Sequence, residues 1–309
     1  MVDSSIKTDN LLYKYMSFET ALKVLDKTSL KWSSPVDFTD RFDSGIRMLE
    51  NFVEKNVKDK ITRIIISAIS KKKKRIGHYN GVVVSLINGL RQEKFDKEKV
   101  LNVINDFYQN IYPPKLEVDA YQSLLDKYYL YQLRVICFTK RSDNERMWDL
   151  YADGYKGVVL GFDQNNMFLR NEPDKIIHHK SVQYRDDDKL LINKPSFFAA
   201  HYLLKVGDKY LNRLSAMPIF EKKKSYDTEE EIRFFYEIPS QKINEEKSSC
   251  SFNRFNPEGL KKIFLGDKIS ENDQKSIKEQ IVKINPNIEI YLLKTQNNKI
   301  KFEKIDCEV

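Results

Sequence analysis

Strand-like sequence in this chain is interrupted by a long region patterned for helices. Short strand-like segments occupy residues 11–15 and 30–34, and a proline at position 35 ends the second. From about residue 45 to 131 the apolar residues recur at helical spacing instead. The pattern predicts an α+β fold with a mixed or antiparallel central sheet, flanking helices and a helical insertion. The predicted division is 1–44 and 132–309 for the α+β domain and 45–131 for the insertion.

The segment from Leu133 to Asp163 carries the clearest local signals. Strand-like sequence at 133–139 and 157–162 flanks a short helix. Ser142 and Glu145 have the spacing of a capping box, and Gly154 is placed to end the helix in the left-handed conformation. We expect the functional site to be organised around this segment.

Other elements are predicted from periodicity and capping residues. Ser17 is expected to open a helix. Further helices are expected over 196–214 and 271–283, and further strands over 229–237, 260–266 and 288–294.

Composition excludes several classes of protein. The chain is 41% hydrophobic and 12% aromatic, which excludes wholesale disorder. No apolar run approaches the roughly 20 residues that span a bilayer, and the first residues carry no signal-peptide apolar region. Cys137, Cys250 and Cys307 are few and far apart, which is typical of a reducing compartment. We expect a cytoplasmic protein with no membrane partner.

The net charge of +8 does not by itself indicate a nucleic-acid partner, because 45 acidic residues are mixed among 53 basic ones. The dense run from Lys71 to Arg75 lacks interleaved aromatic residues and is expected to be a solvated helix end or loop. His178 and His179 point to opposite faces of a strand and make a poor chelate, so no metal site is expected from them.

The junction between strand and helix at 139–142 is the first candidate site. Lys140 and Arg141 precede a helix N-terminus, whose free amides favour an anion such as phosphate; ordinary surface cations explain them equally well. Within the helix, Trp148 and Tyr151 lie one turn apart. They form either part of the core or a wall on which a flat ring stacks.

The second candidate site is the acidic strand that begins at Glu229. Alternation predicts Glu229, Glu231 and Arg233 on one face, with Ile232 among the core residues of the other. At that spacing one carboxylate can be tuned by its neighbour and by the arginine. A solvated Glu–Arg pair on an exposed face is the alternative.

The third candidate site follows the second strand. Asp40 and Asp43 lie after Ser33, at a strand end where binding loops are usual. Solvated turn acids explain these two residues equally well.

Several short sequence blocks along the chain carry a family resemblance. They are Leu12–Tyr15, Trp32–Pro35 with Asp37, Phe38 and Asp40, Cys137–Thr139, Met147–Ala152, Gly157–Asp163, Glu229–Arg233 and Ile263–Gly266. In this order, the blocks resemble the bacterial family catalogued as domain of unknown function 2971. The chain departs from the usual pattern at Thr39 to Phe42, where the family has Asn-Asp-Pro-Phe, and at Tyr226, where it has tryptophan.

A weaker resemblance, by order and residue type alone, is to ADP-ribosyltransferases. It implies NAD as the substrate and places Tyr13 or Tyr15, Thr139 and Glu231 on an early, a middle and a later strand. Under this hypothesis, Glu231 stabilises the oxocarbenium-like centre and Glu229 orients an acceptor, either nucleic acid or protein. The candidate cofactor-binding residues are Tyr13, Tyr15, Ser33, Lys140, Arg141, Trp148, Tyr151 and Arg233.

Two other functions stay open at this point. A magnesium-dependent nuclease would use Asp40, Asp43, Glu229 and Glu231 as ligands, although the common nuclease pattern has a lysine where Arg233 stands. A non-enzymatic binding module, in a bacterial stress or antiviral system, would present the helical insertion to a partner.

Overall fold

The chain folds into two compact units, each built from separate stretches of sequence. Unit 1 comprises residues 1–33, 133–182 and 226–309, and unit 2 comprises 34–132 and 183–225. The computed structural model describes residues 10–38, 52–71, 75–92, 94–169, 176–205, 217–238, 249–296 and 299–306.

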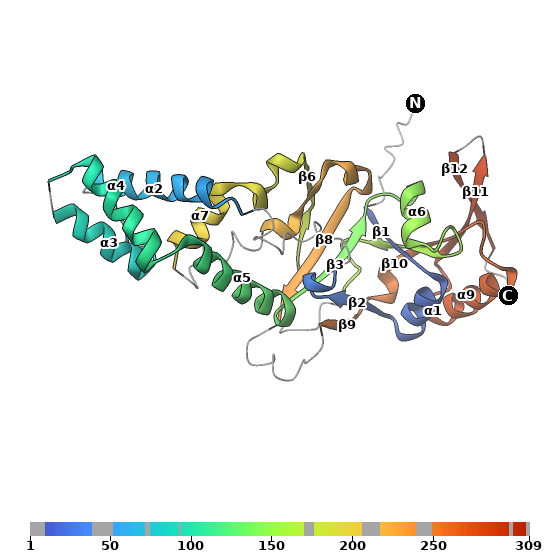
Figure 1. Ribbon diagram of the computed structural model, residues 1–309. Coiled ribbons are helices and arrows are strands. Elements are labelled where there is room, and N and C mark those ends of the chain that lie inside the picture. The colour runs from blue at the N-terminus through green and yellow to red at the C-terminus, as the bar shows by residue number, and fades with distance from the viewer. Residues whose placement is uncertain are drawn as a thin grey trace, which may run out of the picture. The chain divides into compact units, whose positions relative to one another are not determined.

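Unit 1 is built on a mixed sheet of ten strands in the order β12-β11-β10-β4-β1-β3-β2-β9, with β8 paired to β3 and β5 paired to β8 (Figure 1). Within this sheet β10 and β11 run parallel, and the other pairs are antiparallel. This arrangement confirms the predicted α+β class. The strands are β1 Leu11–Met16, β2 Ser29–Ser33, β3 Leu133–Thr139, β4 Val158–Asp163, β5 His178–Ser181, β8 Glu231–Glu237, β9 Cys250–Arg254, β10 Leu260–Leu265, β11 Glu289–Gln296 and β12 Lys299–Ile305.

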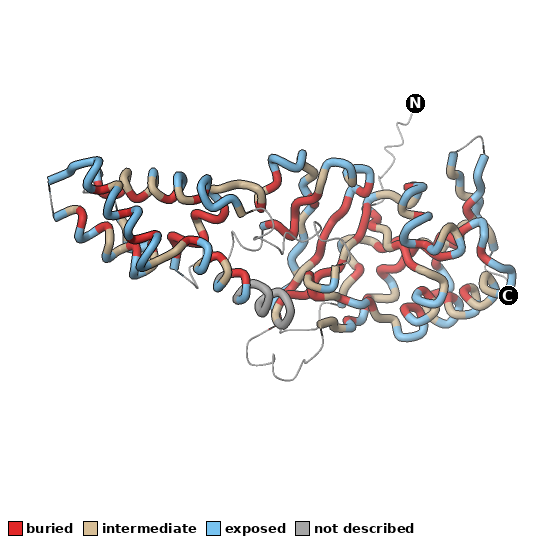
Figure 2. The backbone as a smooth tube through the Cα atoms, in the orientation of Figure 1, coloured by how far each residue is buried: buried red, intermediate tan, exposed pale blue. Residues whose placement is uncertain are grey.

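One face of the sheet carries the main apolar core of unit 1. Ile136, Phe138, Ile232, Phe234 and Tyr236 all belong to it, as the alternation in β3 and β8 predicts. Helices α1 (Phe18–Lys27) and α9 (Glu271–Ile284) contribute residues to the same core. Strands β3 and β8 are buried along most of their length (Figure 2).

The other face is covered in part by helix α6, which spans Glu145–Tyr151. Trp148 packs there in a second cluster with Tyr15, Val159 and Phe264. Because Tyr13 and Tyr15 are two residues apart on β1, both side chains lie on this face.

Unit 2 is mainly helical. Its described helices are α2 Glu54–Ser70, α3 Gly81–Gln92, α4 Lys97–Asp106, α5 Pro114–Tyr131 and α7 Pro195–Leu203, with a π-helical turn at Phe107–Ile111 and a parallel strand pair, β6 Gln183–Arg185 and β7 Glu221–Lys223. Among the described helices of both units, none is long and apolar enough to cross a membrane.

Residues 183–225 fold with unit 2, whereas the sequence analysis assigned them to the α+β domain. Helix α7 is the physical reason, because it buries side chains all round, including Phe197, Phe198 and Tyr202, and packs against α2 and α5. A helix that is apolar on every side has to be enclosed by other helices. Helix α7 ends at Leu203, with Leu204 as its C-cap, so the predicted helix over 196–214 is wrong at residues 204–205, and 206–214 lie outside the described residues.

Two predicted boundaries are wrong by two residues. Helix α6 is capped by Asn144, whose Oδ1 accepts from the Met147 amide at 3.2 Å, and not by Ser142. Strand β8 begins at Glu231, because Glu230 adopts a positive φ of 44° and Glu229 ends a 3-10 turn, Lys224–Glu229. The described chain also contains strands that the sequence analysis did not predict, namely β6, β7, β9 and β12.

Candidate functional site

Tyr13, Thr139 and Glu231 form a row across three neighbouring strands. In the sheet register Tyr13 lies opposite Thr139, and Thr139 lies opposite Glu231. Residues directly opposite each other in a sheet point to the same face. Since neighbouring strands are about 4.8 Å apart, the Cα atoms at the two ends of the row are separated by roughly 10 Å. One face, within the span of a small ligand, therefore carries Thr139, Glu231 and Tyr13. The resemblance to ADP-ribosyltransferases had left Tyr13 and Tyr15 open for the early strand.

Thr139, at the centre of the row, is fully buried and holds two loops together. Its hydroxyl donates to the Glu229 carbonyl and accepts from the Arg141 amide at 3.1 Å. The Lys140 amide also donates to the Glu230 carbonyl, at 3.3 Å. These bonds fix the end of β3 against the turn that precedes β8.

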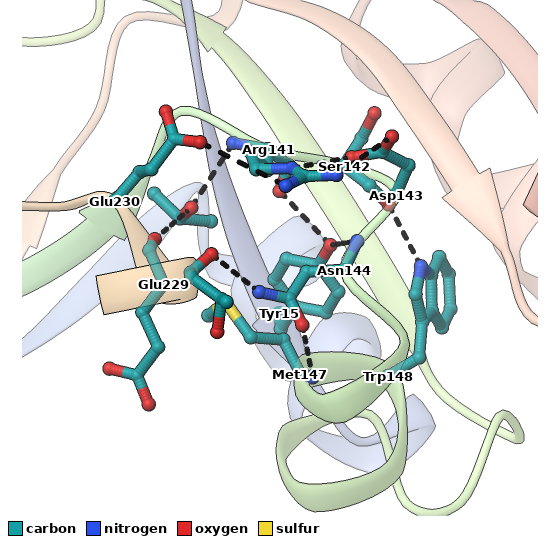
Figure 3. A network of polar contacts seen from close by, with 11 residues as sticks. Tyr15, Arg141, Ser142, Asp143, Asn144, Met147, Trp148, Glu229 and Glu230 are labelled. Atoms are coloured by element: carbon teal, nitrogen blue, oxygen red, sulfur yellow. Dashed lines mark hydrogen bonds and ion pairs between the residues drawn. The ribbon is translucent and has the colours of Figure 1, made fainter. Parts of the chain in front are cut away.

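Tyr15, on β1, forms hydrogen bonds to the loop between β3 and α6. Its hydroxyl donates to the Arg141 carbonyl at 3.0 Å and accepts from the Asn144 amide at 3.3 Å (Figure 3). Burial raises the pKa of Tyr15 well above its usual value, so this hydroxyl stays protonated and able to donate. Tyr15 thus positions the loop between β3 and α6.

Asn144 connects helix α6 to the turn before β8. While its Oδ1 caps the helix, its Nδ2 donates to the Thr228 carbonyl at 2.7 Å. One side chain therefore ties α6 to the turn before β8, which also carries Glu229. The residue escaped the sequence analysis because Ser142 matched the capping-box pattern better.

Trp148 does not form the predicted stacking wall with Tyr151. It is fully buried, donates its indole N–H to the Ser142 carbonyl at 2.8 Å, and stacks on Tyr155 with ring centroids 6.1 Å apart. Tyr151 is 46% exposed on α6. The core interpretation is therefore correct for Trp148, because its edge-on contact with Tyr15 and its stacking on Tyr155 occupy the ring.

Glu231 and Arg233 form a buried, two-pronged ion pair within β8. The guanidinium donates to the two carboxylate oxygens at 2.7 and 3.1 Å, and the two side chains are 7% and 0% exposed. The alternative of a solvated pair on an exposed face is therefore wrong, because both faces of β8 are buried along most of the strand. A carboxylate held at both oxygens has a fixed orientation and charge.

Arg141 makes the corresponding pair at the surface. It binds Asp143 at 2.9 and 3.2 Å, and Glu230 lies 4.0 Å from its Nη1. Hydrogen bonding to Asp143 raises the pKa of Arg141 further above its usual value. Lys140 is exposed, and it makes no ion pair with the described residues, so it is the cation at this junction best placed to meet an incoming anion.

The remaining candidates fall outside the row. Ser33 lies opposite Val135 on β3, four residues before Thr139 and so about 13 Å away along the strand. Glu229 is buried in the 3-10 turn and does not share a strand face with Glu231.

The magnesium hypothesis depends on residues that the structure leaves out. Asp40 and Asp43 lie outside the described residues. Within the described part of the chain, no three His, Cys, Asp or Glu side chains are grouped so as to hold a metal ion. The nuclease alternative stays a prediction.

Comparison with known proteins finds a family that matches part of the chain. Neither the curated proteins nor the solved structures contain a significant match to this chain. Among protein families, residues 147–234 match the family described as "Protein of unknown function (DUF2971)". The match completely covers three of the blocks named above, Met147–Ala152, Gly157–Asp163 and Glu229–Arg233. Over the segment from α6 into β8, this chain is therefore similar to that family.

Proposed function

We propose that unit 1 cleaves the bond between nicotinamide and ribose in NAD, in the manner of an ADP-ribosyltransferase. The observation that supports this proposal best is the row of Tyr13, Thr139 and Glu231 on one sheet face. The acceptor of the ADP-ribosyl group is proposed to be nucleic acid, protein or water, and the setting a bacterial stress or antiviral response in the cytoplasm.

In the proposed reaction, the bond from the nicotinamide nitrogen to ribose C1′ breaks, and its electron pair goes to the nitrogen. The acceptor then bonds to C1′ and gives up its proton. Positive charge develops on the ribose between these events. A fixed carboxylate beside C1′ stabilises that charge more than it stabilises the bound substrate, which lowers the barrier.

Glu231 has the properties that this role requires. Arg233 binds both of its oxygens, so the carboxylate is ionised and does not reorient during the reaction. In this account Arg233 is a positioning residue, and the hydrogen bonds of Thr139 and Tyr15 fix the loops on either side. Lys140 is proposed to meet the pyrophosphate.

The test uses the full chain and NAD labelled in the nicotinamide ring, with and without nucleic-acid and protein acceptors. The wild type is expected to release nicotinamide. Glu231→Asp keeps the charge but withdraws the carboxylate by one methylene, so it should lose most of the activity while staying folded. The double variant Glu231→Gln with Arg233→Met removes both buried charges and serves as the folded control without a carboxylate.

Two outcomes would overturn the proposal. If the wild type releases no more nicotinamide than the double variant with any of the acceptors, the row of Tyr13, Thr139 and Glu231 does not cleave NAD. Equal release by the wild type and Glu231→Asp would mean that Glu231 only balances the charge of Arg233.

A further inference from the structure

Two cavities in unit 2 meet at Ser196, near the start of helix α7. One has a volume of about 370 Å³ and the other about 430 Å³. Both lie in the range of small-molecule sites, roughly 300 to 1,000 Å³. They lie along helices α2 and α7, which pack against each other, and we call them together the α2–α7 groove.

The first cavity is positively charged. Lys60 and Arg63 reach it from one side of α2, and Lys194 reaches it from the residue before α7. Asp59 is the only acidic residue among the described residues that line it. In the described part of the chain, none of the three cations forms an ion pair with a carboxylate.

Helix α7 adds to this positive charge. No side chain caps its N-terminus, where Lys194 stands at the cap position and Pro195 follows. Pro195 has no N–H, and the Phe197 amide donates to the Lys194 carbonyl at 2.9 Å. The Ser196 amide and the helix dipole at this end favour a negative group. Together with the three cations, they make the first cavity suited to a single carboxylate or phosphate.

The second cavity is mainly apolar. Ile64 follows Arg63 directly on α2, and Ala200, Leu203 and Leu204 lie further along α7 than Ser196. The lining therefore changes from charged to apolar in the same chain direction along both helices. Ser196 to Leu203 spans roughly 10 Å at the helical rise of 1.5 Å per residue.

The wall of the apolar cavity is held in place by hydrogen bonds. The Asn80 amide donates to the Leu203 carbonyl at 2.8 Å, and Asn80 Nδ2 donates to the Tyr202 carbonyl at 2.6 Å. The neighbouring Tyr79 pairs with Leu204 as an isolated bridge. A cavity with a fixed wall costs little to order when a ligand binds.

We propose that the α2–α7 groove binds an amphipathic anion, a molecule with one carboxylate or phosphate head and a single hydrocarbon chain. The head lies against Lys60, Arg63 and Lys194, and the chain runs past Ile64 and Ala200. This site lies within unit 2 and is independent of the NAD-cleaving activity proposed for unit 1.

The test is calorimetric titration of the full chain with decanoate. Decyltrimethylammonium has the same chain with the opposite charge, and acetate has the same head without the chain. Decanoate should bind at one saturable site, at least about tenfold more tightly than either comparator. The double variant Lys60→Gln with Arg63→Gln should weaken decanoate binding by about tenfold, since it removes two charge-assisted contacts.

Matched controls separate the groove from general effects. Lys97→Gln makes the same kind of change at an exposed residue of α4 that lines neither cavity, and it should leave binding unchanged. Ala200→Phe fills the apolar cavity and should weaken decanoate but not acetate. Where Ala200→Phe lowers stability in a thermal melt, the surface double variant decides the result.

Several results would overturn the proposal. If decanoate and decyltrimethylammonium bind with equal affinity, the groove binds hydrocarbon chains without selecting the charge of the head. If decanoate and acetate bind with equal affinity, the groove binds an anion but not its hydrocarbon chain. The absence of saturable decanoate binding, or an unchanged affinity in the double variant, would remove the proposed site altogether.

Discussion

Two arginine–carboxylate pairs, one that includes Glu231 of the candidate row and one in the loop after Thr139, differ mainly in burial. Arg233 binds Glu231 at 2.7 and 3.1 Å with side chains 0% and 7% exposed. Arg141 binds Asp143 at 2.9 and 3.2 Å with side chains 41% and 49% exposed. The contacts are nearly the same, but water competes for only one of them. Burial therefore holds the Glu231 carboxylate in one position, whereas the side chains of the exposed pair can exchange their contact for contacts with water.

Breaking the buried pair should have the largest effect on stability. Glu231→Gln removes the carboxylate and leaves the Arg233 charge buried without its main balance. We expect a loss of about 3–5 kcal/mol in the free energy of unfolding, measured with urea. A loss below about 1 kcal/mol would show that the guanidinium is balanced elsewhere, and the comparison would fail.

Removing both partners should cost much less than removing one. In the double variant Glu231→Gln with Arg233→Met, neither charge of the pair is left without the other, so most of the stability lost in Glu231→Gln should return. The coupling is read from the double-mutant cycle formed with the two single variants. If the stability lost in the double variant equals the sum of the losses in the two single variants, Glu231 and Arg233 are not directly coupled.

An intermediate effect on stability is expected at Thr139, whose hydroxyl connects the loop after β3 to the turn before β8. Thr139→Val keeps the shape but removes the hydroxyl that bonds Glu229 and Arg141. The buried Glu229 carbonyl and the partly buried Arg141 amide then lose their partner, at a cost of about 1–3 kcal/mol. Thr139→Ser keeps the hydroxyl and is the control; if it destabilises as much as Thr139→Val, packing of the methyl group is the cause.

The smallest effect is expected at the exposed pair. Asp143→Asn should change the free energy of unfolding by about 0–1 kcal/mol. That change should shrink further in 0.5 M salt, where the screening length falls to roughly 4 Å. A large, salt-independent loss would mean that the surface pair behaves like the buried one.

Periodicity and capping residues predicted much of unit 1. The alternation of Ile232, Phe234 and Tyr236 identified the core face of β8, and Ser17 identified the start of α1, where its side chain accepts from the Thr20 amide at 3.3 Å. The family resemblance, and not the periodicity, selected Tyr13, Thr139 and Glu231. Strand register then brought these residues into one row.

Other features depend on partners distant in sequence. Alternation shows which side chains share a face, but not whether that face is buried, so the sequence left open whether Glu231 and Arg233 form a solvated surface pair. The positive φ of Glu230 follows from the turn that Thr139 holds, 90 residues away from Glu229 in sequence. The sequence likewise gave no signal that β9 would pair with β2.

The central claim is that the fixed carboxylate of Glu231 acts on NAD. The most direct test is the release of labelled nicotinamide by the wild type, Glu231→Asp and the double variant, each first shown to be folded by its thermal melt. Our account predicts release by the wild type, a loss of most of it in Glu231→Asp, and none in the double variant. Equal release by all three folded proteins would contradict it.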